Sequence, residues 1–369
     1  MSRTIAASPA SQSAPQPLTY PETVDAMYAH LRRRLADVVP DFELRQQAEI
    51  AVEVNRLKAE RNAVILGHNY MEPVLYHSVP DYTGDSLGLS RISAEVDAET
   101  IVFCGVRFMA ETAKILNPSR TVLLPSPRGG CSLAEAINAD QVRRLRAKYP
   151  EVPIVTYVNT YADVKAESDF CCTSGNAAAV ISTLRDQGHD QIIFLPDEYL
   201  AANTAAELGL PFRVEGAASL DESPEPLDPG TIIGWAGRCE VHEQFTVDDI
   251  TAARQQFADV RVLAHPECSP EVIEASDFSG STTQMLKYVD QTNEGRLMLL
   301  TECSMGDNIA SQSPDREILR TCSVRCPHMN EITLSQTLEA LRRTRHVIKV
   351  PEEIASRARV SLDRMIATG

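Results

Sequence analysis

Three apolar runs of similar length recur along the chain, and each ends in polar residues. Their β-branched composition is typical of buried parallel strands. A turn of small and hydroxyl-bearing residues follows each run, where a helix is expected to begin, and a second strand-like run comes next. The first runs are AVILGHNY (63–70), PIVTYVNT (153–160) and VRVLAHPE (260–267). The turns are GDSLGLS (84–90), CTSGNAA (172–178) and GSTTQML (280–286), and the second runs are TIVFCGV (100–106), QIIFLPD (191–197) and RLMLLTE (296–302). The pattern predicts three units of alternating strands and helices.

Each unit then supplies one cysteine at the same point of the repeat: Cys131, Cys239 and Cys326. The spacings are 108 and 87 residues, and the difference of 21 fits an insertion in the second unit. The acidic, proline-broken segment 218–230 is the expected place for that insertion, as a surface loop. A repeat of strands and helices can arise in any α/β protein, so the phase of the cysteines is what makes the three units convincing.

Alternation of strands and helices favours an α/β fold with parallel sheets. In such sheets ligands bind beyond the carboxyl ends of the strands. Three units that face one axis would therefore bring their strand ends and cysteines to one central site. We expect a flexible N-terminal arm over 1–40 and three α/β units over 41–145, 146–255 and 256–369, with approximate boundaries and with terminal helices free to pack across units.

Composition places the chain among globular proteins and excludes several classes of partner. Of its 369 residues, 43% are hydrophobic and 23% charged, and a net charge of −16 disfavours nucleic acid and anionic membranes. No apolar run has the length of a membrane span. The first forty residues, rich in Ala, Ser, Pro and Gln, do not resemble a secretion signal. A cytoplasmic protein is expected, in which nine cysteines would remain thiols.

Three thiolates without an obvious fourth cysteine point to a particular metal chemistry. A structural zinc site usually has four ligands, and an electron-transfer iron–sulfur cluster generally has four as well. With three, one iron of a 4Fe–4S cluster stays open to act as a Lewis acid. Most other cysteines suit core packing, as Cys104, Cys171 and Cys172 do. Cys268 and Cys303 receive no role, and Cys322 could be a spare ligand, a redox partner or neither.

Polar side chains gather where the first strand of each unit ends, and hydroxyls gather in the turns. The strand-end residues are His68, Asn69, Tyr70, Tyr157, Asn159, His265 and Glu267, and the turn hydroxyls are Ser86, Ser174, Ser281 and Thr282. Individually these hydroxyls would most often cap helices. Because they recur at one phase in all three units, we favour an anion site at helix N-termini. His242 also lies close to one of the cysteines, whereas His30, His77, His189 and His346 look ordinary.

At these residues the chain resembles the quinolinate synthase family, whose motifs occur here in family order over about residues 60–365. The matching segments are GHNY, GDSLGLS, GVRFMAETAKILNP, CSLAEA, YVNT, CTSGNA, CEVHEQF, HPEC, SGSTTQM and CPHMNEITL. The resemblance implies three pseudo-equivalent α/β/α sandwich domains, with short parallel sheets, around a central active site. It also implies a 4Fe–4S cluster held by Cys131, Cys239 and Cys326. One departure is TCSVRCP, where family members often have a Cys-x-x-Cys-x-x-Cys arrangement.

The implied reaction condenses iminoaspartate with dihydroxyacetone phosphate, giving quinolinate, phosphate and water in de novo NAD biosynthesis. We expect Glu267, with a raised pKa, to be the general acid or base. Tyr70 and Tyr157 would orient substrate or donate protons. The resemblance supports His68, His242 and His265 as pocket residues, of which His242 and His265 are catalytic candidates, and the turn hydroxyls as contacts of carboxylates or phosphate. An enzyme that supplies iminoaspartate is the one protein partner that this reaction suggests.

Three other functions compete with this hypothesis. Another hydro-lyase with a three-cysteine cluster would share the open iron but not the three hydroxyl turns. A redox sensor or electron carrier would need no pocket. A zinc-stabilised binding module could close its site with the three thiolates and His242 or His328.

Overall fold

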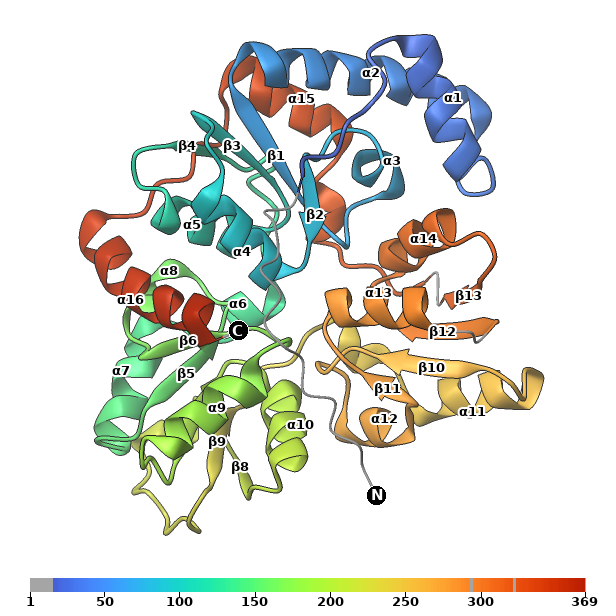
Figure 1. Ribbon diagram of the computed structural model, residues 1–369. Helices are drawn as coiled ribbons and strands as arrows, with labels where there is room; N and C mark the ends of the chain where they lie inside the picture. Colours follow the sequence, from blue (N-terminus) through green and yellow to red (C-terminus); the bar gives the residue numbers. More distant parts are fainter. Residues whose placement is uncertain (1–15, 293–294, 321–322, 369) are drawn as a thin grey trace.

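Three separate parallel sheets form the framework of the protein. The computed structural model describes residues 16–292, 295–320 and 323–368. The strand orders are β2-β1-β3-β4, β6-β5-β7-β9-β8 and β11-β10-β12-β13, and every pairing between these strands is parallel. The sheets lie around a common centre (Figure 1). The predicted α/β class and the three-unit repeat are therefore confirmed.

The first unit is the upper one in Figure 1. Its elements are α2 (Asp41–Glu60), β1 (Ala63–His68), α3 (Pro73–Tyr76), β2 (Tyr82–Gly84), α4 (Ser86–Glu95), β3 (Thr100–Cys104), α5 (Arg107–Leu116), β4 (Thr121–Leu123) and α6 (Ser132–Glu135). Both predicted runs became the adjacent strands β1 and β3, with Val64 beside Ile101 and Leu66 beside Phe103. These side chains are buried, as their composition predicts.

The second unit, at the lower left of Figure 1, repeats this order and adds one strand. Its elements are α7 (Ala139–Lys148), β5 (Ile154–Tyr157), α8 (Ala162–Ala166), β6 (Phe170–Cys172), α9 (Ala177–Asp186), β7 (Ile192–Leu195), α10 (Glu198–Leu208), β8 (Phe212–Glu215), the 3-10 turn η1 (Ser219–Asp221), β9 (Ile232–Trp235) and the 3-10 turn η2 (His242–Gln244). The extra edge strand β8 and the largely exposed segment 221–229 account for the predicted insertion.

The third unit again has four strands. Its elements are α11 (Val247–Gln256), β10 (Arg261–Ala264), α12 (Pro270–Ala275), β11 (Phe278–Ser279), α13 (Thr282–Gln291), β12 (Arg296–Leu300), α14 (Cys303–Gln312), β13 (Glu317–Arg320) and the 3-10 turn η3 (Met329–Glu331). Alternate residues of its strands face opposite sides, so that Val262 packs with α11 and α12 whereas Leu263 packs with α13 and α14. Helices on both faces make this unit an α/β/α sandwich.

The two C-terminal helices pack on the first and second units instead of extending the third unit. α15 (Leu334–Arg343) packs on α2 and β3 of the first unit. α16 (Glu352–Thr368) contacts α5 of the first unit and α8, α9 and β6 of the second. One continuous apolar core, which includes Leu341, Leu362 and Met365, consequently joins these two units.

The helices that connect the units differ from the expected boundaries. Val142 and Leu145 of α7 pack in the core of the second sheet, and Ile250 of α11 packs in the core of the third. Each of these helices therefore starts the unit that follows it. The second unit begins before residue 146 and the third before residue 256, because side-chain packing and not chain position assigns a helix to a core.

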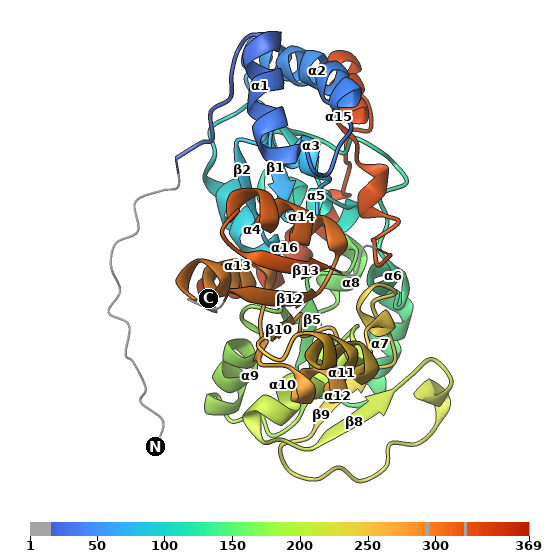
Figure 2. The same cartoon turned by 90° about the vertical axis from the view of Figure 1, so that its right-hand side faces the viewer.

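The expectation of a flexible arm over 1–40 is wrong for the part of the arm that forms α1 (Val24–Leu35). The Thr23 side chain caps this helix by accepting a hydrogen bond from the Ala26 N–H. Met27, Leu31 and Leu35 lie on one face of the helix and are fully buried. Their spacing gives the apolar stripe that fixes α1 on α2, as both views show (Figures 1 and 2). The arm's first fifteen residues lie outside the described residues.

Among the described helices, none combines the length and the apolar character needed to cross a membrane.

Candidate active site

The carboxyl ends of the three sheets open into one central pocket. The space in it, open solvent at its mouth included, is about 710 Å³. Thirteen of the fourteen predicted site residues line it: Cys131, Cys239, Cys326, His68, Tyr70, Ser86, Tyr157, Asn159, Ser174, His242, His265, Glu267 and Thr282. The exception is Ser281, which caps α13 by accepting a hydrogen bond from the Gln284 N–H and does not line the pocket. The convergence follows from three parallel sheets that point to the same centre.

The three cysteines occupy equivalent positions, each in the loop after the last strand of its unit and before a short helical turn. In every loop the sulfur accepts hydrogen bonds from the backbone N–H groups two and three residues further on. The donors are Leu133 and Ala134 for Cys131, Val241 and His242 for Cys239, and His328 and Met329 for Cys326. Such donors stabilise a thiolate or a metal-bound sulfur.

Contacts between the loops hold the three cysteines at one end of the pocket. The Glu240 N–H donates a hydrogen bond of 3.3 Å to the Ser132 hydroxyl, which joins the first two loops. His328 Nε2 lies 3.1 Å from a Glu240 carboxylate oxygen, which joins the second and third. The backbone at Gly237, in the loop that carries Cys239, approaches the Pro196 backbone so closely that only glycine fits: a Cβ at Gly237 would meet the Pro196 carbonyl oxygen at 2.4 Å.

Burial and donor chemistry together fit a metal group at the three cysteines. Burial raises the pKa of the Cys131, Cys239 and Cys326 thiols, while the backbone N–H groups act in the opposite direction. A buried thiolate is unfavourable without a positive partner, and a metal ion supplies one. All three are free cysteines, so no disulfide consumes them. The donor set therefore suits a cluster with three thiolate ligands. Cys322, whose role the sequence left open, lies outside the described residues.

A chain of hydrogen-bonded side chains crosses the pocket beside Cys239. The Tyr157 hydroxyl donates to Glu267 Oε1 at 2.5 Å, and the other carboxylate oxygen lies 2.8 Å from His242 Nδ1. His242 Nε2 lies 3.0 Å from the Thr301 hydroxyl, which contacts the Tyr70 hydroxyl at 2.6 Å. The chain runs through side chains of all three units, so their correct docking is needed to form it.

Glu267 is ionised in this setting, which corrects the expectation of a raised pKa. Burial alone would raise the pKa of its carboxyl group. The imidazoles of His265 and His242, where they are protonated, and hydrogen bonds from His242 and Tyr157 outweigh burial, and the pKa lies well below its usual range. Glu267 is therefore a proton acceptor and not a proton donor at neutral pH.

Four other ionisable groups around Glu267 are neutral, namely His68, His265, Tyr70 and Tyr157. Burial lowers the pKa of His68 to about 4 and that of His265 to about 3, so both imidazoles are uncharged at neutral pH. Burial, followed by the Glu267 charge, raises the pKa of Tyr70 and Tyr157 well above the ordinary value. Both phenols keep their protons and can donate hydrogen bonds to a ligand.

Two helices of ten residues, α4 and α13, place their first residues on the pocket, and the loop before a third helix, α9, reaches the pocket through Ser174. Ser86 is the first residue of α4, and Thr282 is the first of α13. Ser174, three residues before α9, has its hydroxyl 3.3 Å from His265 Nε2. Unpaired N–H groups and the helix dipole give each end a partial positive charge. Anionic groups are therefore favoured there.

Buried acceptor atoms show that the pocket is also prepared for hydrogen-bond donors. Asn159 Oδ1 is buried and has no hydrogen-bond partner among the described residues. Such an atom is costly to bury unless a ligand or water completes it. Asn69, which directly follows β1, donates to the Thr282 hydroxyl at 2.9 Å and ties the first unit to the third.

Three acidic lining residues, Asp85, Glu240 and Glu302, were not predicted from the sequence. Asp85 caps α4 through the Gly88 N–H. Glu302 follows the central strand β12 and accepts hydrogen bonds from the Ser304 and Cys326 N–H groups. Burial raises the pKa of Glu302 to about 7. Extending the strand-end rule from the first strand of each unit to the second would have found Thr301 and Glu302.

Lys165 supports the loop that carries Tyr157 and Asn159. It is completely buried, and its ammonium group donates hydrogen bonds to the carbonyl oxygens of Val158, at 2.8 Å, and Thr160. We expect Lys165→Met to reduce the free energy of unfolding by about 1–3 kcal/mol for each carbonyl left unpaired. Urea unfolding of the variant measures this loss.

Lys114 provides the matched control, because it donates to the carbonyl oxygens of Pro118 and Arg120 near the surface. Water can replace its ammonium group, so Lys114→Met should lose much less stability than Lys165→Met. Equal losses in the two variants would contradict the role given to Lys165.

Comparisons with known proteins agree with this site. Residues 52–367 match the model of the family described as "Quinolinate synthetase A protein". The chain is 48% identical over 345 residues to "Quinolinate synthase 2" of Mesorhizobium japonicum, which covers 94% of this chain and 99% of the relative. It is 48% identical over 338 residues to "Quinolinate synthase" of Agrobacterium fabrum, which covers 92% and 91%. It is 50% identical over 311 residues to "Quinolinate synthase" of Xylella fastidiosa, which covers 84% and 85%.

The family model spans far more than half of the chain, and the relatives are matched over nearly their whole length. The motifs that carry the resemblance line a single pocket, at equivalent places in three α/β units. On this evidence the chain belongs to the quinolinate synthetase A family.

Proposed function

We propose that the protein is a quinolinate synthase that condenses iminoaspartate with dihydroxyacetone phosphate, releasing quinolinate, phosphate and water for NAD biosynthesis. The observation that carries the proposal is the convergence, in one pocket, of three equivalent cysteine loops and of one turn hydroxyl from each unit, Ser86, Ser174 and Thr282. Family membership supports the choice of reaction. The pocket supports its chemistry, because both substrates are compact anions.

The cofactor is a 4Fe–4S cluster held by Cys131, Cys239 and Cys326. With three thiolate ligands, one iron would remain open to supply a Lewis acid toward substrate oxygen. The repeated N–H donors to all three sulfurs support this ligand set. A reducing compartment such as the cytoplasm would keep the thiols available for the cluster.

The substrates' carboxylates and phosphate bind at the N-termini of α4 and α13 and at the turn before α9. The hydroxyls of Ser86, Ser174 and Thr282 donate hydrogen bonds to them, in addition to the helix N–H groups. Ser281 contributes by capping α13 and thus setting the position of Thr282. Asn159 accepts a hydrogen bond from a substrate hydroxyl or nitrogen through its unpaired Oδ1.

Proton transfers involve the side chains around Glu267. As an ionised carboxylate it removes protons from the condensing substrates, and His242 at 2.8 Å can relay them. Tyr157 and Tyr70, which keep their protons, hold the substrate oxygens that leave as water. Neutral His68 and His265 orient the substrate without adding charge. Burial of all these groups limits competing reactions with solvent.

A quinolinate assay with anaerobically reconstituted protein and both substrates tests the function. We expect quinolinate and phosphate in equal amounts, and no product when either substrate is omitted. A protein with a full complement of iron and sulfide that forms no quinolinate would refute the proposal.

Ser174→Ala should weaken the binding of a dicarboxylate inhibitor while leaving cluster content unchanged. A hydrogen bond to a charged group contributes about 1.5–3 kcal/mol, so the inhibition constant should rise roughly 10- to 150-fold. Inhibition kinetics with a dicarboxylate and with a neutral analogue of the same size measure the effect. The affinity for the neutral analogue should change much less, and equal losses for both would contradict an anion contact at Ser174.

A further inference from the structure

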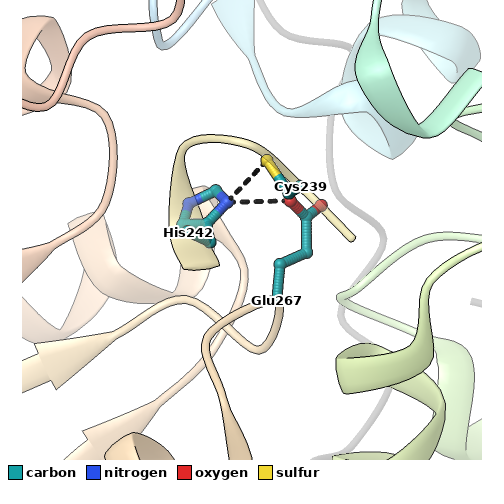
Figure 3. Close-up of side chains that lie close together, drawn as sticks. All are labelled: Cys239, His242 and Glu267. Carbon is teal, nitrogen blue, oxygen red and sulfur yellow. Dashed lines mark hydrogen bonds and ion pairs between the residues drawn. The ribbon is translucent and has the colours of Figure 1, made fainter. Parts of the chain in front are cut away.

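Cys239, His242 and Glu267 form a compact group of potential metal ligands of three different kinds. Figure 3 shows their side chains pointing toward one another from the loop after β9 and the loop after β10. One ligand atom from each lies within 4.8 Å of the others. His242 Nδ1 is the central atom, at 3.2 Å from Cys239 Sγ and 2.8 Å from Glu267 Oε2. His242 and Glu267 are 2% and 3% exposed, so solvent does not compete strongly for these atoms.

Neighbouring residues hold two of the three ligands in the orientation that a cation requires. His242 Nε2 lies 3.0 Å from the Thr301 hydroxyl oxygen, which can accept a hydrogen bond from a protonated Nε2. This tautomer leaves Nδ1 free to bind a metal. Glu267 Oε1 accepts a hydrogen bond from the Tyr157 hydroxyl, and Glu267 Oε2 therefore faces His242 Nδ1. Outer partners of this kind, on the second nitrogen of a histidine and the second oxygen of a carboxylate, are typical of metal sites.

The ligand set selects the class of cation. A thiolate, an imidazole and a carboxylate together suit zinc, whereas magnesium and calcium prefer oxygen ligands throughout. Tetrahedral zinc with its usual bond lengths would place the ligand atoms about 3.4–3.6 Å apart. The separation of 3.2 Å between His242 Nδ1 and Cys239 Sγ would therefore have to widen by about 0.2–0.4 Å, and that of 2.8 Å between His242 Nδ1 and Glu267 Oε2 by about 0.6–0.8 Å. Three protein ligands would leave a fourth position for water.

We propose that the chain without its cluster binds one zinc-class divalent cation through Cys239 Sγ, His242 Nδ1 and Glu267 Oε2. Binding breaks the S–H bond of Cys239, whose proton goes to solvent, and uses the His242 tautomer that carries its proton on Nε2. The Nε2–H group donates to Thr301, so each cation releases one proton in all. No electrons are transferred.

This site shares Cys239 with the proposed cluster, so the two metal groups exclude each other. Zinc bound first would occupy one of the three thiolates that the cluster needs, and it would also occupy Glu267 and His242. The zinc site would therefore control whether the chain can accept its cluster. This consequence rests on the proposed function, whereas the cation site itself does not.

Titration of the metal-free, anaerobic full-length chain with Co²⁺, a spectroscopic substitute for Zn²⁺, tests the site. We expect one cation per chain and a thiolate-to-cobalt charge-transfer band. Cys131→Ala and Cys326→Ala should retain both, because neither residue belongs to the group. Cys239→Ala should lose the band, and His242→Ala should weaken binding by more than the roughly 10- to 100-fold typical of losing an outer partner.

Thr301→Val provides a test that keeps all three ligands and the side-chain shape. It removes only the partner of Nε2, so cobalt should bind about 10- to 100-fold more weakly while the band persists. Equal losses in Cys131→Ala and Cys326→Ala would place the cation among the three cysteines and overturn the proposal. Failure to bind one cation per chain would overturn it as well.

Reconstitution with iron and sulfide tests the exclusion. Chain preloaded with Zn²⁺ should take up less iron than metal-free chain, and a zinc chelator should restore the uptake. A full cluster together with one retained zinc would overturn mutual exclusion. Quinolinate formation by zinc-free, cluster-loaded enzyme is measured separately, so failure of the cation site and failure of the proposed function give different results.

Discussion

Replacement of Cys239 by alanine should leave a chain that cannot retain a 4Fe–4S cluster and forms no quinolinate. The variant loses one of three thiolates, and the backbone N–H groups of Val241 and His242 lose the sulfur to which they donate. Cys131→Ala and Cys326→Ala should behave in the same way, because all three loops have the same pattern of donors. Iron and sulfide analysis and the cluster's absorption spectrum after anaerobic reconstitution provide the measurement.

Cys268→Ala is the matched control for these variants. Cys268 is as buried as a core residue and directly follows Glu267, but it does not line the pocket. Its thiol contacts the Leu300 carbonyl oxygen at 3.6 Å. Removing it should cost some stability and leave iron content unchanged. A complete cluster spectrum in Cys239→Ala, or loss of iron in Cys268→Ala, would show that the ligand set is wrong.

Glu267→Gln should lower kcat by about two to four orders of magnitude, which is the usual contribution of a general acid or base. The amide keeps the shape of the carboxylate but cannot accept a proton. It can also accept through only one atom, so either Tyr157 or His242 loses its acceptor. Because Glu267 is not one of the proposed cluster ligands, iron content should remain normal. Steady-state kinetics together with iron analysis separate these two effects.

Glu271→Gln serves as the comparison, since Glu271 lies on the exposed side of α12, four residues away in the chain. Its turnover should match that of the unaltered protein. Near-normal turnover in Glu267→Gln would remove Glu267 from the proton-transfer role and leave it a structural acceptor for Tyr157 and His242.

The sequence by itself determined the repeat and the position of most site residues. Burial on both faces of a parallel sheet requires continuous apolar runs, and six such runs became β1, β3, β5, β7, β10 and β12. Polar residues that end a parallel strand must lie at its carboxyl edge, wherever the strand is placed. The phase of Cys131, Cys239 and Cys326 in the repeat therefore located them correctly, although no two are close in the chain.

Local pattern was less informative where packing between distant segments decides the structure. α1 was assigned to a flexible arm because its surroundings are rich in small and polar residues, yet Met27 and Leu31 are buried against other helices. The C-terminal helices α15 and α16 pack on the first two units, far from their own place in the chain. The surfaces on which α15 and α16 pack could not be identified from periodicity, which predicts that a helix has an apolar face but not which surface covers that face.

Only the tertiary structure decided the electrostatics of the pocket. The pKa of Glu267 is lowered and not raised, because His265, His242 and Tyr157 stabilise its charge more than burial opposes it. These groups come from different units, and their distances to the carboxylate depend on how the units dock. Ser281 was likewise expected at the pocket from its place in the turn; its hydroxyl accepts a hydrogen bond from its own helix and donates one of 3.3 Å to Asp85, which lines the pocket in its place. Sequence specifies which groups a strand end or turn can offer; the balance between charge, burial and hydrogen bonds is set by contacts between residues that are distant in the chain.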